Sequence, residues 1–101
     1  MYLIQILLPL YDNADEAFEQ AVYERVRDEL TKKFGGVTAF HNSPAEGIWK
    51  ESGRVSRDAI IIFEVMAAEL ERDWWTTYRA HLEARFQQDK MIVRATRIEQ
   101  L

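Results

Sequence analysis

The residues of this chain that could form a chemical site are polar side chains that stand singly in apolar, alternating stretches. There are three such stretches with their polar centres: Gln5 in Tyr2–Leu8, Glu64 in Ala59–Met66, and Arg94 in Met91–Ile98. Successive side chains of a β-strand point to opposite faces. Each strand would therefore have one wholly apolar face and one apolar face with a polar centre.

A carboxylate and a guanidinium on such a half-buried face are expected to pair, with Gln5 between them as a shared hydrogen-bond partner. One interpretation is structural, because such a group can fix the register of a sheet or of a dimer. The functional interpretation is an anchor for an anion or a polar ligand at the floor of a cleft. In a third interpretation, one or more of these three side chains simply reach solvent. None of these residues is an obvious nucleophile.

His41 and His81 are the side chains that titrate near neutral pH without large perturbation. Neither has Asp, Glu or His at the spacing of metal ligands, so we expect no metal site. His41 ends a predicted strand, where functional residues are common, and it is a candidate ligand-binding residue. The alternative is a surface histidine without a role.

The stretch from Pro44 to Glu51 has the most unusual local sequence, because proline and glycine there force a bend. In a functional interpretation it is a flap over the open sheet face, in which Glu46, Trp49 and Lys50 contact a ligand. In a structural interpretation it is a bulged strand whose tryptophan packs on the sheet edge or on a partner subunit.

The composition is that of one globular domain of 101 residues. There is no cysteine, which fits a reducing compartment. The apolar runs are too short to span a bilayer and the start lacks the features of a signal peptide, so we expect a cytoplasmic protein without a membrane partner. A net charge of −4, with basic residues scattered among acidic ones, argues against nucleic-acid binding.

Two helices are predicted from apolar residues at helical spacing. The first follows the capping residues Asp12–Asp15, carries Asp15, Glu16 and Glu19 in its first turns, and ends at Gly35-Gly36. Its stripe consists of Phe18, Val22, Val26, Leu30 and Phe34. The second covers about Leu70–Lys90, with a stripe of Trp74, Tyr78, Leu82 and Phe86 and with Trp75 alongside.

With a further strand at Val37–His41 and a hairpin turn at Glu51–Arg54, the element order is β-α-β-β-α-β. Right-handed crossovers then favour a ferredoxin-like α+β sandwich with strand order 4-1-3-2 and both helices on one face. Gln5, Glu64 and Arg94 should meet on the opposite, open face. Apolar residues surround them there: Leu3, Leu7, Ile60, Ile62, Met66, Ile92 and Ile98.

Because this open face is so apolar, we expect another protein surface to cover it, and we predict a homodimer. In this pattern of elements the chain resembles the dimeric α+β barrel group of ferredoxin-like proteins, and the resemblance implies two sheets facing each other. The sequences Phe34–Phe40 and Gly47–Lys50 also resemble small bacterial proteins of unknown function with a Phe-x-Gly-x-Thr and Gly-x-Trp pattern. That resemblance implies no activity.

Some members of the dimeric barrel group oxidise haem with an Asn, a Trp and a His. This chain has Gln5 in place of the Asn and has Trp74 and Trp75 on the second helix, so we expect no cofactor. Two functions remain open. The first is a small homodimeric binding or structural module that uses the open sheet face. The alternative is a cofactor-independent enzyme of the monooxygenase or isomerase type, with a small-molecule cleft around Gln5, Glu64 and Arg94.

Overall fold

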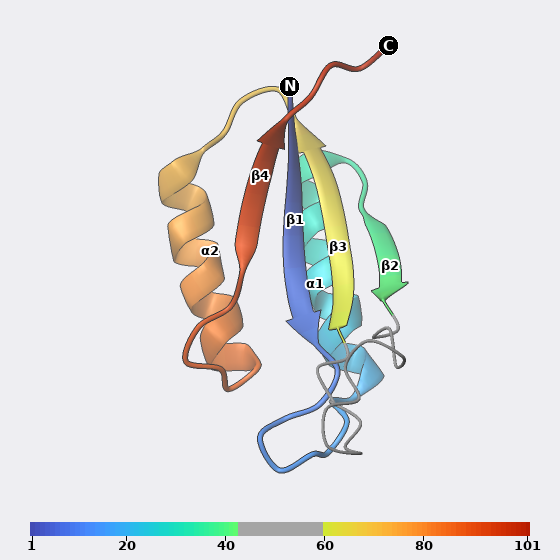
Figure 1. The fold of residues 1–101 in the computed structure, drawn as a ribbon, viewed down its shortest axis with the longest axis vertical. Helices are drawn as coiled ribbons and strands as arrows, with labels where there is room; N and C mark the ends of the chain where they lie inside the picture. Colours follow the sequence, from blue (N-terminus) through green and yellow to red (C-terminus); the bar gives the residue numbers. More distant parts are fainter. Residues whose placement is uncertain (43–59) are drawn as a thin grey trace, which may run out of the picture.

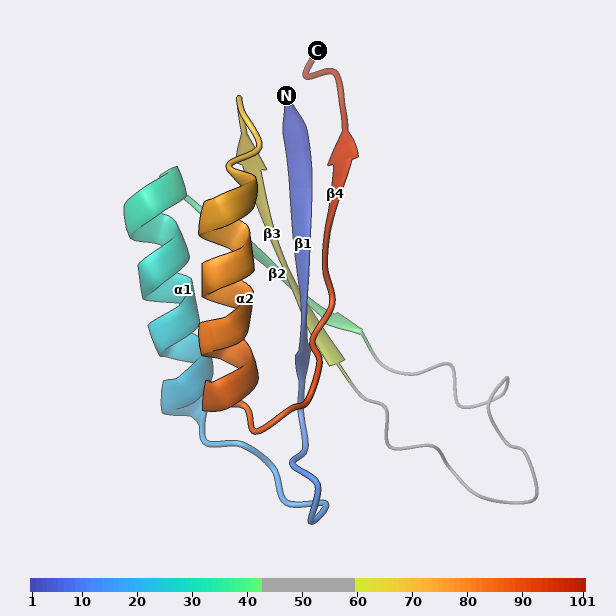
Figure 2. The same cartoon turned by 90° about the vertical axis from the view of Figure 1, so that its left-hand side faces the viewer.

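Four antiparallel strands form one sheet, and both helices pack on the same face of it (Figures 1 and 2). The computed structural model describes residues 1–42 and 60–101, with residues 41 and 42 described by their backbone. The elements are β1 (Tyr2–Pro9), α1 (Gln20–Phe34), β2 (Thr38–Asn42), β3 (Ile60–Ala67), α2 (Arg72–Arg85) and β4 (Val93–Arg97). The sheet order is β2-β3-β1-β4, so the predicted ferredoxin-like α+β topology is confirmed.

Strand β1 lies in the middle of this sheet and pairs with a neighbour along each edge. It pairs with β3 from Tyr2↔Ala67 to Pro9↔Ile60, and with β4 from Tyr2↔Arg97 to Ile6↔Val93. Strand β2 pairs only with the far edge of β3. The register of β1 therefore decides which side chains of β3 and β4 share a face.

The core lies between the sheet and the helices, where the predicted alternation is confirmed. Ile4, Ile6 and Leu8 of β1 are fully buried, and β3 adds three alternate residues, Ile61, Phe63 and Val65. The helices contribute Tyr23, Val26 and Leu30 from α1, and Trp75, Tyr78 and Leu82 from α2. Each fully buried aliphatic side chain stabilises the fold by about 1.5–3 kcal/mol.

The predicted start of the first helix is wrong, because α1 begins at Gln20 and has no acidic residue in its first turn. The Asp12 carboxylate accepts hydrogen bonds from the backbone N–H groups of Ala14 and Glu16, at 2.8 and 2.9 Å. Asp15 has a φ of 61°, in the left-handed region. These side-chain bonds close a local turn, so the predicted capping residues form a loop before the helix.

The end of α1 agrees with the sequence. Gly35 has a φ of 83°, and its N–H donates to the carbonyl oxygen of Thr31 at 2.8 Å. Glycine reaches this conformation without the steric cost that a Cβ atom imposes. Lys32 and Lys33 lie in the last turn, where positive charges interact favourably with the helix dipole.

Helix α2 is shorter than predicted, and three residues of its predicted stripe, Tyr78, Leu82 and Phe86, are buried as expected. Trp75 is the buried tryptophan, whereas Trp74 is only partly buried. Trp74 stacks on Tyr78 with ring centroids 4.8 Å apart, and the ammonium of Lys33 lies 4.6 Å from its ring centre. The predicted last strand is shortened in the same way, to Val93–Arg97.

A charged contact joins the two helices on their outer side. Arg85 donates two hydrogen bonds to Glu29, at 2.7 and 3.1 Å, and the Tyr78 hydroxyl donates to the same carboxylate at 3.0 Å. The bonds from Arg85 hold the pKa of Glu29 below its usual value, and burial together with Glu29 raises the pKa of Tyr78. The contact fixes the position of α2 relative to α1.

Replacing Glu29 with Gln should lower the free energy of unfolding by about 1–2 kcal/mol, since hydrogen bonds to charged groups are lost but the carboxylate is partly screened by solvent. The lowered pKa means that Glu29 stabilises the fold above its unfolded-state pKa, and that this contribution is lost as pH falls through the folded-state pKa. The difference between wild type and Glu29→Gln should therefore shrink from pH 7 to about pH 3.

Urea denaturation at both pH values measures this difference. Glu24→Gln is the matched control, because Glu24 is exposed on the same helix. An equal effect of the two changes, or a difference for Glu29→Gln that does not depend on pH, would contradict the assignment.

Candidate functional site

The three polar residues of the alternating stretches lie side by side on the open sheet face. In the strand register Gln5 is opposite Glu64 on one side and opposite Arg94 on the other. Its Nε2 donates to Oε1 of Glu64, and its Oε1 accepts from Nε of Arg94 at 2.7 Å. The expectation that Gln5 is a shared hydrogen-bond partner is confirmed. We call this set of residues the polar triad.

The amide of Gln5 can make both bonds in one orientation only. Its NH₂ group faces an acceptor, the Glu64 carboxylate, and its carbonyl oxygen faces a donor, the Arg94 guanidinium. A flipped amide would place oxygen against oxygen and N–H against N–H. The two charged neighbours therefore orient Gln5, and Gln5 holds their side chains in place.

The expected pairing of Glu64 with Arg94 is indirect and runs through Gln5. Among the described residues, no ion pair within 4 Å joins them, and Arg94 is exposed while Glu64 is half-buried. The charges lie on strands that are separated by β1, so the contact between them passes through the amide. The two Nη groups of Arg94 donate to no described residue.

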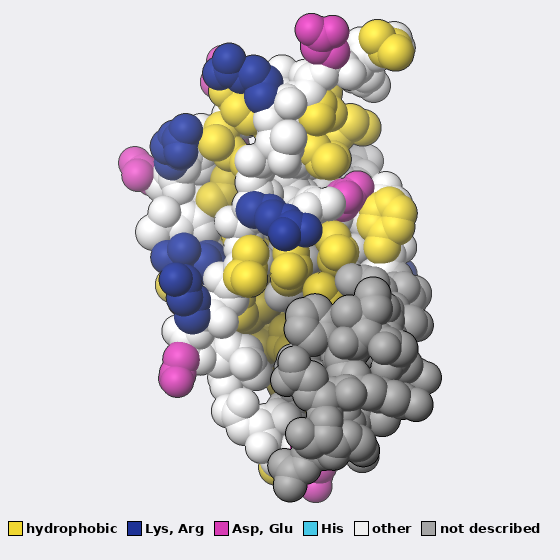
Figure 3. Space-filling model, viewed as in Figure 1, with side chains coloured by type: hydrophobic (Ala, Val, Ile, Leu, Met, Phe, Trp, Pro, Cys, Tyr) yellow, Lys and Arg dark blue, Asp and Glu magenta, His cyan; other side chains and the backbone are white. Residues whose placement is uncertain are grey.

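Apolar side chains lie on both sides of the polar triad. On one side of the triad, Leu3 of β1 lies opposite Met66 of β3. On the other side, Leu7 lies opposite Ile62, and Ile62 in turn lies opposite Phe40 of β2. Met66 is 49% exposed and Phe40 47% exposed. Figure 3 shows this face, with hydrophobic side chains around a central cationic and an adjacent acidic group. This apolar surface with a polar centre is the interface candidate.

The structure places the other predicted site residues only in part. His41 lies in β2, where its backbone pairs with Ile61. Glu46, Trp49 and Lys50 lie outside the described residues, so the interpretation of the 44–51 stretch as a flap or as a bulged strand stays a prediction.

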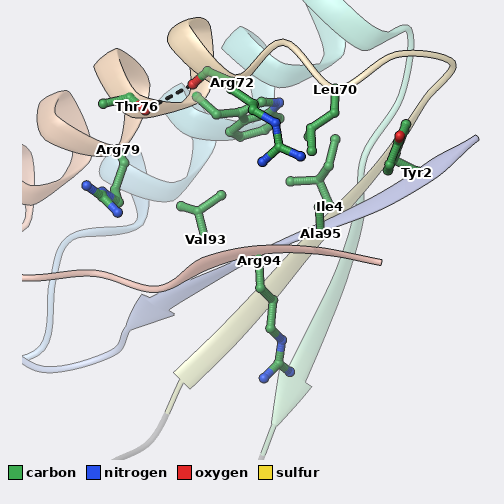
Figure 4. A pocket seen from close by; sticks show the side chains of 10 residues that line it. Tyr2, Ile4, Leu70, Arg72, Thr76, Arg79, Val93, Arg94 and Ala95 are labelled. Atoms are coloured by element: carbon green, nitrogen blue, oxygen red, sulfur yellow. Dashed lines mark hydrogen bonds between the residues drawn. The ribbon is translucent and has the colours of Figure 1, made fainter. Parts of the chain in front are cut away.

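A second candidate site was missed by the sequence reasoning. A cavity of about 350 Å³ opens between α2 and the strands β1 and β4, on the helix side of the sheet (Figure 4). Its lining residues are Tyr2, Ile4, Leu70, Arg72, Trp75, Thr76, Arg79, Val93, Arg94 and Ala95. The guanidinium of Arg94 points away from it, towards the open face (Figure 4).

The sequence signal for this cavity is weak. Arg72, Thr76 and Arg79 follow one another at spacings of four and three residues, which places them on one face of a helix. The same spacing is common on solvated helix faces. Only the packing of α2 against β4 shows that this face borders a cavity.

No protein-family model matches the chain, and no curated protein or solved structure matches it significantly. In the described part of the chain, no group of three or more His, Asp or Glu side chains could hold a metal ion. Neither α1 nor α2 is long and apolar enough to cross a membrane. The polar triad, the surface around it and the cavity are the features of the described structure that bear on function.

Removing the central amide should destabilise the protein. Gln5→Leu leaves the half-buried carboxylate of Glu64 without its hydrogen-bond donor, and we expect a loss of about 1–3 kcal/mol of unfolding free energy. The double variant Gln5→Leu/Glu64→Leu removes donor and acceptor together, and most of the stability should return. Urea denaturation of these two variants and of Glu64→Leu alone tests this.

Thr96→Leu is the control for adding an apolar side chain to this face, since Thr96 is exposed on β4. It should change stability by little. If the double variant were as unstable as the sum of its single changes, the hydrogen bond from Gln5 to Glu64 would have no energetic role.

Proposed function

We propose that this protein is a homodimeric binding module in which a second copy covers the open sheet face, as in the dimeric α+β barrel group. The observation that carries the proposal is the interface candidate, in which partly and strongly exposed apolar side chains surround a polar centre. Ile92 adds a further side chain that is 53% exposed. Contiguous apolar surface of this kind usually marks an interaction site.

The size of the face is compatible with a dimer interface. Two strands of eight residues and two of five, at about 3.4 Å rise and about 4.8 Å spacing, give a projected area of roughly 420 Å². The accessible area of a corrugated surface is larger than its projection, and stable interfaces bury about 800 Å² per partner. A second copy of the same sheet would present a face of the same extent.

The charge pattern of the polar triad supports self-association. Arg94, Gln5 and Glu64 form a line of cation, neutral amide and anion across three strands. A twofold axis between the sheets and parallel to β1 would place each Arg94 opposite the partner's Glu64. The Nη groups of Arg94, which donate to no described residue, supply donors for that contact, and opposite charges then meet across the interface.

The alternative function, a cofactor-independent enzyme at the polar triad, has less support. Gln5 has no ionisable group, Arg94 donates its Nε–H to Gln5, and one carboxylate oxygen of Glu64 already accepts the bond from Gln5. The enzyme class requires a general base or a nucleophile next to a substrate cleft. The cavity lies on the other side of the sheet, away from the triad side chains.

Sedimentation at micromolar concentration should give twice the chain mass of 11.9 kDa. Met66→Lys should shift the protein to monomer, because it puts a cation into the apolar part of the interface candidate. Ala80→Lys, on the exposed surface of α2, should leave the dimer intact. A wild-type protein that is monomeric at micromolar concentration would refute the proposed dimer.

Charge reversal tests the twofold arrangement itself. Glu64→Arg and Arg94→Glu should each weaken dimerisation, since like charges would then face each other across the axis. The combined swap restores opposite charges and should recover the dimer. Sedimentation of all three variants gives the answer, and a double variant weaker than both single ones would exclude this axis.

A further inference from the structure

We propose that the cavity between α2 and β4 binds a small organic carboxylate with an apolar body. In this site, which we call the arginine cavity, Arg72 pairs with the carboxylate, and Arg79, which lines the cavity seven residues further along α2, adds a second positive charge. Tyr2, Ile4, Leu70, Val93 and Ala95 form the apolar and aromatic surface that contacts the rest of the ligand. The site is on the opposite face of the sheet from the interface candidate, so the proposal does not depend on the dimer.

The guanidinium of Arg72 has no partner among the described residues. Arg72 is exposed at the first residue of α2, and its side chain makes no hydrogen bond or ion pair to a described residue. In Figure 4 it points into the space between the helix and β1. The neighbouring acid Glu71 pairs with Lys33 at 3.2 Å and does not neutralise Arg72 by direct contact. Arg72 is therefore available to a ligand.

Arg79 lies seven residues further along the helix and is only partly compensated. Its Nε is 3.9 Å from Oε2 of Glu83, too far for a hydrogen bond, and that oxygen already accepts from the N–H of Met91 at 2.9 Å. The Nε atom is shielded from water and unpartnered among the described residues, while the side chain as a whole is 42% exposed. Its terminal nitrogens remain available for an anion.

The contrast with Arg85 supports this interpretation. Arg85 makes a two-bond contact with Glu29, and its side chain is only 14% exposed, as expected for an arginine with a structural role. In the part of the chain that the structure describes, neither Arg72 nor Arg79 has such a partner. Two under-compensated guanidinium groups beside an apolar surface leave a place for a group that carries both a carboxylate and hydrocarbon.

The dimensions and lining favour a carboxylate over a phosphate compound. A volume of about 350 Å³ is at the small end of ligand pockets. Free phosphate would leave the apolar surface unused, and the chain has no glycine-rich phosphate loop. The carboxylate of Glu83 near Arg79 also disfavours a dianion. A monoanion with an aliphatic or aromatic body fits the charges and the surface together.

Titration calorimetry with octanoate tests the proposal on the full-length protein, with octan-1-ol and inorganic phosphate as comparison ligands. We expect octanoate to bind at least tenfold more tightly than octan-1-ol, and phosphate to bind more weakly than octanoate. This comparison needs no variant, so it does not depend on the folding of a mutant. No octanoate binding, equal binding of the alcohol, or tighter binding of phosphate would overturn the proposal.

Arg72→Gln should weaken octanoate binding at least fivefold, and Arg79→Gln should weaken it less, because Arg79 contributes its charge without contacting the carboxylate. Arg27→Gln, the same change on the exposed surface of α1, is the matched control and should bind as wild type does. Circular dichroism checks that the variants are folded. Amide NMR shifts on octanoate addition should be largest at Thr76 and Ala95. Shifts confined to the open sheet face would show that octanoate binds elsewhere. Unaltered affinity in both arginine variants would show the same.

Discussion

The pairing of β1 along both of its edges determines where the polar residues of this protein lie. Ile4 and Ile6 are fully buried, and Gln5 lies between them on the other face. A slip of one residue would exchange the two faces and carry Gln5 into the core. A buried polar group without a partner costs several kcal/mol, so the apolar residues of β1 exclude that register. The polar triad is a consequence of this constraint.

The constraint also explains which features could be read from the sequence. Alternation is a local property of a strand, so the core faces and the meeting of Gln5, Glu64 and Arg94 were predictable. The start of α1 was not, because Asp12 can cap a helix or close a loop, and a contact between Tyr11 and Ala17 favours the loop. Which of the two tryptophans is buried, Trp75 and not Trp74, depends on how α2 packs against α1. The arginine cavity depends on α2 and β4 being brought together, which no single segment encodes.

The charged side chains of the described structure divide into two groups by how fully they are satisfied. The Glu29 carboxylate takes bonds from Arg85 and Tyr78, which leaves a closed network between the helices. In the polar triad and the arginine cavity, by contrast, guanidinium nitrogens remain without partners. Closed networks fix the positions of elements, whereas open ones retain donors for another molecule. The polar triad and the arginine cavity both retain such donors.

Strand β4 connects these two sites, because its alternate residues serve opposite faces. Val93 and Ala95 form part of the arginine cavity, while the Arg94 side chain belongs to the polar triad. The strand is at the edge of the sheet and pairs with β1 over five positions, so a shift of its backbone would move both sets of residues together. A ligand in the cavity and a second copy on the open face would thus act on the same strand. Any effect of one on the affinity of the other must then be equal in both directions.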